Sequence, residues 1–161
     1  MPKYTFLFIF LLIYTTAIAQ KKLPPVQIET ATGQLAELTS QTNKAGYTIV
    51  SFWATWCKPC LKELDVLKEK LPYWQEKTNV QLLAVSADDS RTKGRVPTIF
   101  RSKNWPAKLF FDSNGDAQRA LQVLAIPHTF ILNKHNEIIY QHTSFVLGDE
   151  LLYEKVLMKV K

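Results

Sequence analysis

The chain is poor in cysteine and histidine. Its 161 residues include only two cysteines and three histidines, whereas 47% of them are hydrophobic. This composition suits one globular domain and leaves little room for a second. Two cysteines form at most one intrachain disulfide, but a chain of this length buries a core without several such bridges. The sequence contains no internal repeat, low-complexity tract or interdomain linker.

The sequence also lacks a long run of charge of one sign. Its net charge is +6, but the lysines and arginines are scattered among acidic residues and form no arginine-rich arm. This pattern disfavours binding to nucleic acid and is typical of a soluble surface with a positive bias. Such a bias helps to attract acidic surfaces of partner proteins.

A long hydrophobic run occurs only near the N-terminus. Lys3 is the only charged residue before Lys21, and the apolar run at residues 4–19 ends in the letters AIA. A short basic start, an apolar centre and an A-x-A end predict a secretory signal peptide at residues 1–19, followed by a mature domain at residues 20–161. The alternative is an uncleaved anchor, although the run is shorter than the roughly 20 residues that span a bilayer. Because no cysteine follows the run, a lipid-modified N-terminus there is excluded.

The two cysteines, Cys57 and Cys60, form a C-x-x-C motif. Such a motif is a structural disulfide, half of a metal site or a redox pair. A bridge between the two closes a very short loop and therefore adds little stability. A tetrahedral zinc site needs four ligands, and the spacing of seven between His128, His135 and His142 is not that of a zinc motif. We therefore expect no metal or cofactor and favour the redox pair.

The surrounding sequence favours a reactive pair. Residues 47–53 are rich in β-branched and aromatic side chains, which predicts a buried strand. Residues 61–71 carry leucines at helical spacing, which predicts an amphipathic helix that ends at Pro72 or shortly after it. Cys57 then lies at the N-terminus of a helix, where free N–H groups, the helix dipole and Lys58 stabilise a thiolate.

The position of each residue along this helix predicts its role. Cys57 is expected to be exposed and to attack a substrate disulfide, whereas Cys60 lies one turn deeper and resolves the mixed disulfide. Pro59 is tolerated in the first turn because its missing N–H costs little there. Glu63 lies three residues after Cys60 on the same helix face. It is either a proton donor and acceptor for Cys60 or an ordinary solvated glutamate, and spacing alone does not separate the two.

The remaining pattern predicts an α/β fold with a central mixed sheet flanked by helices. Short strands at residues 26–29 and 35–38 form an N-terminal β-hairpin, and a strand at residues 80–86 completes a βαβ unit. The other expected elements are a loop and short helix within residues 87–105, a strand at 107–111, a helix at 117–123, a hairpin of residues 129–132 and 137–142, and a closing helix at 149–160.

This order of elements, with the string FWATWCKPC at residues 52–60, resembles the thioredoxin superfamily and more narrowly the TlpA/ResA-like extracytoplasmic thiol-disulfide oxidoreductases. The resemblance covers roughly residues 24–160 and implies a thioredoxin-like fold. In the superfamily, a proline at the position of Pro127 is cis, lies beside the disulfide and helps to dock the partner's backbone. The alternative is a trans proline that opens a strand. The substrate-binding residues implied by the resemblance are Trp56, Lys58, Pro59, Ile126 and Pro127.

The resemblance also bears on Glu63. TlpA/ResA-like proteins carry C-x-x-C-x-x-E, and their glutamate tunes proton transfer at the cysteines, whereas thioredoxin proper has a buried aspartate at the position of Ser51. Three features depart from the family pattern. First, no proline follows soon after Glu63. Second, residues 88–105 match the family pattern poorly, so we expect partner contacts there to differ. Third, His128 stands where many relatives have threonine. His128 is either a partner contact or a surface residue.

The leading hypothesis is an enzyme that reduces or exchanges disulfides of exported proteins in the periplasm or another extracytoplasmic space. Its catalytic residues would be Cys57, Cys60 and Glu63. The resemblance suggests cytochrome c maturation as a setting and a membrane-bound thiol reductant as the partner that resets the pair. The same chemistry in a net oxidant or isomerase is an alternative. A thioredoxin-like copper chaperone is another, although that family uses C-x-x-x-C with a distant histidine. A peroxiredoxin-type peroxidase is disfavoured because the expected proline ahead of Cys57 is missing.

Overall fold

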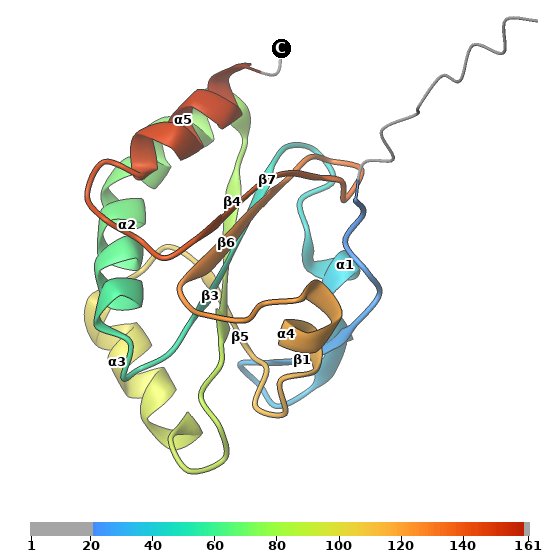
Figure 1. Cartoon of the computed structure of the whole chain (residues 1–161), viewed down its shortest axis with the longest axis vertical. Coiled ribbons are helices and arrows are strands. Elements are labelled where there is room, and N and C mark those ends of the chain that lie inside the picture. Colours follow the sequence, from blue (N-terminus) through green and yellow to red (C-terminus); the bar gives the residue numbers. More distant parts are fainter. Residues whose placement is uncertain (1–20, 160–161) are drawn as a thin grey trace, which may run out of the picture.

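A seven-stranded mixed sheet forms the centre of the computed structural model, which describes residues 21–159 (Figure 1). Its strands are β1 (Gln27–Thr30), β2 (Leu35–Glu37), β3 (Thr48–Trp53), β4 (Gln81–Ser86), β5 (Lys108–Phe111), β6 (His128–Leu132) and β7 (Ile138–Thr143). Their order across the sheet is β2-β1-β5-β4-β3-β6-β7. The central neighbours β3, β4 and β5 run parallel, whereas the other neighbouring pairs are antiparallel. The predicted mixed sheet and N-terminal hairpin are therefore confirmed, and the predicted signal peptide lies outside the described residues.

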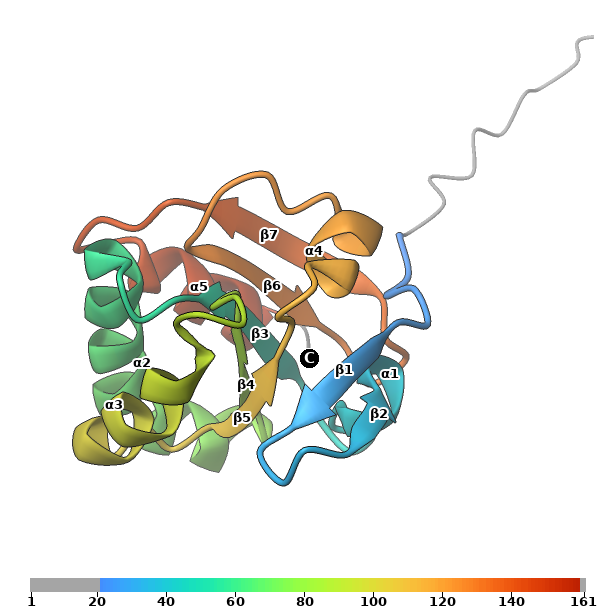
Figure 2. The same ribbon diagram turned by 90° about the horizontal axis from the view of Figure 1, so that it is seen from below.

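Helices cover both faces of the sheet, as predicted. They are α1 (Leu38–Gln41), α2 (Lys58–Thr78), the short 3-10 helix η1 (Lys93–Arg95), α3 (Val96–Lys103), α4 (Asp116–Leu121) and α5 (Glu150–Lys159). Figures 1 and 2 show α2, α3 and α5 on one face, and α1 and α4 on the other. No helix within residues 21–159 combines the length and the apolar character that a membrane crossing requires.

Strand β3 is the centre of the core, and all six of its residues are buried. Side chains alternate between the two faces of a strand. Ile49 and Trp53 accordingly pack in the core beneath α2 and α5, whereas Val50 and Phe52 pack in the core on the side of α4. Ser51 falls between Ile49 and Trp53 in this alternation and therefore faces α2.

Helix α2 is longer than the sequence predicted. It contains Pro72 and extends six residues beyond it to Thr78, so the predicted end at Pro72 or shortly after it is too early. A proline in a helix interior costs about 3 kcal/mol because it removes a hydrogen bond and crowds the preceding turn. The apolar stripe nevertheless continues past it, since Leu71 and Trp74 are fully buried. Trp74 also donates a hydrogen bond from Nε1 to Glu154 of α5 (3.1 Å), so the contact of α2 with α5 continues beyond the proline.

The parallel strands and α2 place the cysteine pair at one edge of the sheet. β3 and β4 are joined through α2 and pair in parallel, which confirms the predicted βαβ unit. Parallel strands end at the same edge of a sheet. The segment after Trp53 and the segment after Ser86 therefore lie side by side, and the Ala87 N–H donates to the Trp53 carbonyl oxygen (2.7 Å). Ligand sites of parallel sheets commonly lie at this edge.

Candidate active site

The cysteine pair lies where β3 passes into α2. Cys57 and Cys60 form a disulfide. Cys57 is the N-cap residue of α2, and its Sγ accepts a hydrogen bond from the Cys60 N–H (3.3 Å). A turn closed by the Cys57 N–H and the Ala54 carbonyl oxygen (3.1 Å) leads from the strand to this cap. The N-terminus of α2 therefore contacts the Cys57 sulfur directly through a backbone N–H group, as predicted for a site that stabilises a thiolate.

Both cysteines are shielded in the disulfide form. Cys60 is fully buried, and Cys57 is only 6% exposed. The predicted order of exposure is confirmed, but the expectation that Cys57 is exposed is wrong for this state. Its sulfur turns toward the N–H of Cys60 and so lies against the first turn of the helix.

The residues predicted to bind substrate lie around this position. Trp56 is 64% exposed although it directly precedes the buried Cys57. Lys58 and Pro59 are exposed in the first turn of α2. The peptide bond between Ile126 and Pro127 is cis, as the resemblance implied. Pro127 directly precedes His128, which pairs with Phe52, so it stands at the same edge of the sheet as the end of β3.

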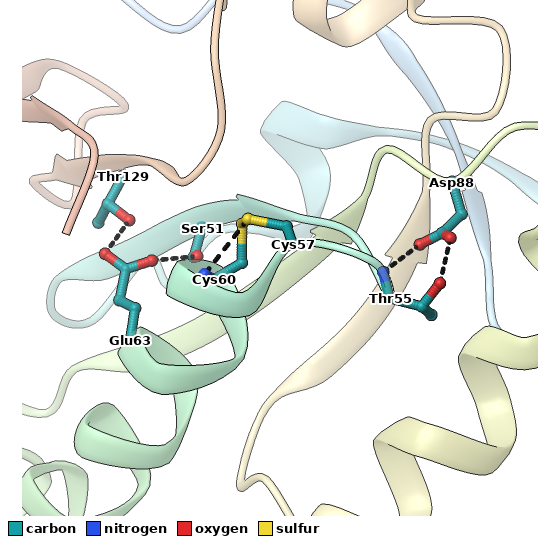
Figure 3. Close-up of a disulfide and its surroundings, with 7 residues drawn as sticks. All are labelled: Ser51, Thr55, Cys57, Cys60, Glu63, Asp88 and Thr129. Carbon is teal, nitrogen blue, oxygen red and sulfur yellow. Dashed lines mark hydrogen bonds between the residues drawn. A yellow bond between two sulfur atoms is a disulfide. The ribbon is translucent and has the colours of Figure 1, made fainter.

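Glu63 is a buried carboxyl group, and the interpretation of it as a solvated surface residue is wrong. The side chain is fully buried on α2. Its Oε1 accepts hydrogen bonds from Thr129 Oγ1 and from the Tyr153 hydroxyl, both 2.8 Å long, and its Oε2 accepts one from Ser51 Oγ (3.0 Å). Figure 3 shows Ser51 and Thr129 pointing at the carboxyl group on one side of the disulfide. Side chains from β3, β6 and α5 thus bind the carboxyl group of Glu63, which lies in the second turn of α2.

This environment favours the neutral form of Glu63. Burial raises the pKa of the carboxyl, and the hydrogen bonds from Thr129, Tyr153 and Ser51, with the charge of His142, offset part of that effect. Burial and the neighbouring Glu63 also raise the pKa of Tyr153, so this hydroxyl stays protonated and acts as a donor. A buried carboxyl with a raised pKa beside a reacting group is a candidate proton donor and acceptor.

A second buried carboxylate, Asp88, lies on the other side of the disulfide (Figure 3). Its Oδ2 accepts hydrogen bonds from the Thr55 N–H (2.8 Å) and from Ser86 Oγ (2.9 Å), and its Oδ1 accepts one from Thr55 Oγ1 (2.6 Å). Asp88 is fully buried. The residue that begins the poorly matching segment 88–105 therefore supports the loop in front of Cys57.

His128 is not a surface residue. It is 7% exposed, and its Nδ1 lies 3.0 Å from Thr143 Oγ1. Its ring packs on Phe130, with 4.5 Å between the ring centroids. Burial lowers the pKa of His128, and the charges of His142 and Lys21 lower it further. The ring is therefore a neutral part of the core next to the cis proline.

Sequence reasoning did not find four of the residues that surround the pair. Thr129, Tyr153, Thr55 and Asp88 approach it from distant segments or from a loop. The sequence offered one signal, because Ser51 occupies the position of a buried aspartate in thioredoxin, and a polar residue in a wholly buried strand needs a partner. Within residues 21–159, no group of three histidine, cysteine or acidic side chains has the arrangement of a metal site.

Comparisons with known proteins agree with this geometry. The sequence profile of the AhpC/TSA family matches residues 19–141. The thiol-disulfide oxidoreductase ResA of Bacillus thuringiensis subsp. konkukian is 27% identical over 121 residues, which cover 75% of this chain and 67% of that protein. The sporulation thiol-disulfide oxidoreductase A of Bacillus subtilis is 33% identical over 100 residues, which cover 60% of this chain and 58% of that protein.

Solved structures show the same fold. A thioredoxin-like protein from Porphyromonas gingivalis superposes with a TM-score of 0.74 at 37% identity, over 83% of this chain and 88% of that one. StoA from Bacillus subtilis superposes with a TM-score of 0.63 at 22% identity, over 83% of this chain and 97% of that one.

Proposed function

The chain belongs to the AhpC/TSA family and is a thiol-disulfide oxidoreductase of the ResA-like type, and on this basis we propose that it reduces disulfides of exported proteins outside the cytoplasm. The observation that carries the proposal is the buried Glu63, three residues after Cys60 and bonded by three hydroxyl groups. It supplies a proton acceptor beside a cysteine that has no access to bulk solvent.

The reaction starts from the reduced pair. The Cys57 thiolate attacks one sulfur of the client disulfide, and the other client sulfur leaves as a thiolate and takes up a proton. Cys60 then loses its proton to the ionised form of Glu63 and attacks the Cys57 sulfur. The second client sulfur leaves as a thiolate and takes up the proton from Glu63, which returns Glu63 to its starting form. The client leaves with both sulfurs reduced, and its two electrons have come from the Cys57–Cys60 dithiol, which is now a disulfide. A membrane-bound thiol reductant returns two electrons and two protons before the next cycle.

The location and the clients rest on other observations. The hydrophobic leader at residues 4–19 with its A-x-A end supports export. The similarity to proteins named ResA supports a role outside the cytoplasm, and the resemblance makes apocytochrome c a candidate client. Trp56 is exposed and directly precedes Cys57, and it gives a client chain an apolar and accessible place to lie next to the pair.

One observation favours the opposite direction of electron flow. The helix N-terminus at Cys57 and the adjacent Lys58 stabilise the thiolate, and a stabilised thiolate makes the reduced form more favourable. A disulfide donor has that property. The buried carboxylate of Asp88, which accepts hydrogen bonds from Thr55 and Ser86, acts against it, because negative charge disfavours a nearby thiolate. We therefore favour the reductant.

Trapping of clients tests the exchange mechanism. In a Cys60→Ser variant, the mixed disulfide with Cys57 has no resolving thiol and should accumulate on exported proteins. A Cys57→Ser, Cys60→Ser double variant is the matched control and should trap none. Thiol-blocked extracts would be separated without and with reductant, and released proteins identified by mass spectrometry. Equal yields from the two variants would contradict the proposed function.

A further inference from the structure

The loop that presents Cys57 is held by Asp88, which follows β4. The carboxylate bonds both the main-chain N–H and the side-chain hydroxyl of Thr55, two residues before Cys57. Ser86 also fixes the carboxylate, because its Oγ donates a hydrogen bond to Asp88 Oδ2 and accepts one from the Asp88 N–H (3.1 Å). Few conformations of the loop satisfy all of these bonds at once.

The same carboxylate places a negative charge against the loop that leads to Cys57. Asp88 is fully buried and accepts its three hydrogen bonds from neutral groups. Among residues 21–159, no lysine, arginine or histidine forms an ion pair with it, although six ion pairs occur elsewhere. Charges interact more strongly in a protein interior than in water. A second negative charge on Cys57, two residues from the bonded Thr55, is therefore disfavoured.

We propose that Asp88 is a positioning residue that fixes the Thr55–Cys57 loop and makes the reduced cysteine pair a stronger electron donor. Stabilising the thiolate favours the reduced form of a dithiol and makes its disulfide an oxidant, as in strongly oxidising family members. A fixed buried anion has the opposite effect. Glu63 on the far side of the disulfide exchanges protons, whereas Asp88 is committed to the loop (Figure 3).

The test uses residues 20–161 and compares substitutions at two different buried aspartates. Asp88→Asn keeps the shape of the side chain and removes its charge. The matched control is Asp112→Asn, because Asp112 is also buried but bonds the N–H groups of Ala117 and Gln118 at the start of α4. Each variant would be equilibrated with reduced and oxidised glutathione at pH 7, and the oxidised fraction of the cysteine pair measured by alkylation.

We expect glutathione to reduce the disulfide of Asp88→Asn more easily than that of the unmodified chain. The equilibrium constant for this reduction should rise by about threefold to tenfold, and a tenfold change equals about 30 mV for a two-electron couple. Asp112→Asn should lower the melting temperature and leave the equilibrium constant unchanged. An Asp88→Asn constant equal to that of the unmodified chain, or shifted in the other direction, would overturn the proposal.

Thr55 supplies a second test that holds even if Asp88→Asn does not fold. In the Cys60→Ser background, Thr55→Val removes one of the three hydrogen bonds to the carboxylate and leaves more of its charge to act on Cys57. Alkylation of Cys57 at pH 7 should slow by about threefold or more, as expected for a smaller thiolate fraction. Thr55→Ser keeps the hydroxyl and should restore the rate. Equal rates in all three proteins would contradict the role of this contact.

This inference depends on the exchange chemistry of the pair and not on its direction. The absolute potential of the unmodified protein tests the proposed reductant, whereas the difference between Asp88→Asn and the unmodified protein tests Asp88. A failure of one is therefore distinguishable from a failure of the other.

Discussion

Ser51 Oγ on β3 donates a hydrogen bond of 3.0 Å to Glu63 Oε2 on α2. The two residues are both fully buried, so the bond joins the central strand to the helix that carries the cysteines. Thioredoxin itself, by resemblance, carries an acidic residue on the strand, whereas this chain carries the acid on the helix and a hydroxyl on the strand. In this chain the buried acidic group therefore stands on the helix, and the strand supplies a hydroxyl group that binds it.

Removal of the Glu63 charge should change how stability depends on pH. The pKa of Glu63 is raised in the folded state above its ordinary value of 4.5, so the native state binds the proton more tightly than the unfolded chain does. The favourable contribution of the neutral group is complete below the unfolded pKa and is lost as the pH rises through the folded pKa. Relative to Glu63→Gln, the unmodified protein should lose stability upward from about pH 4.5, by at most about 1.4 kcal/mol per pH unit.

Urea unfolding at a series of pH values measures this difference. Glu69→Gln is the matched control, because Glu69 lies on the exposed side of the same helix. Its pH profile should parallel that of the unmodified protein. Parallel profiles for Glu63→Gln as well would show that burial of this carboxyl does not perturb its titration.

The sequence predicted the features of the fold that depend on residues close together in the chain. The β-branched strand, the leucine spacing and Cys57 at their junction are local patterns, so the strand, the helix and the N-cap followed from them. Pro72 misled the prediction because burial of Trp74 against α5 is a long-range effect. The partners Thr129 and Tyr153 lie 66 and 90 residues from Glu63. No spacing rule connects them, and only the paired strands and the packed helix bring them together.

Cys57 should react much faster than Cys60 in the reduced protein. Its sulfur caps the helix and is the more accessible of the two, whereas Cys60 is fully buried. With a limiting amount of iodoacetamide at pH 7, we expect modification of Cys57 to exceed that of Cys60 by about tenfold or more, since the thiolate is the reactive species. Peptide mass spectrometry gives both rates, and the Cys57→Ser and Cys60→Ser variants identify each signal. Equal rates would reverse or remove the assigned roles.

Gly46 should be intolerant of any side chain. A Cβ at this position would lie 2.3 Å from the Asn79 carbonyl oxygen, where the segment before β3 passes the end of α2. Backbone atoms on both sides cannot yield easily, so Gly46→Ala should lower the free energy of unfolding by about 2–4 kcal/mol. Gly94→Ala is the control, since a Cβ there meets no atom within 4 Å. Urea titration measures the free energy of unfolding of both variants. Equal values for Gly46→Ala, Gly94→Ala and the unmodified protein would show that the backbone at Gly46 has room for a side chain.

The reduction potential of the Cys57–Cys60 pair tests the proposed reductant most directly. Residues 20–161 would be equilibrated in thiol-disulfide buffers of graded potential, and the oxidised fraction followed by alkylation and tryptophan fluorescence. We predict a value near that of thioredoxin, about −270 mV, as expected for a protein that passes electrons to client disulfides. A value near −120 mV, typical of a strong oxidant, would contradict the proposal and make the protein a disulfide donor.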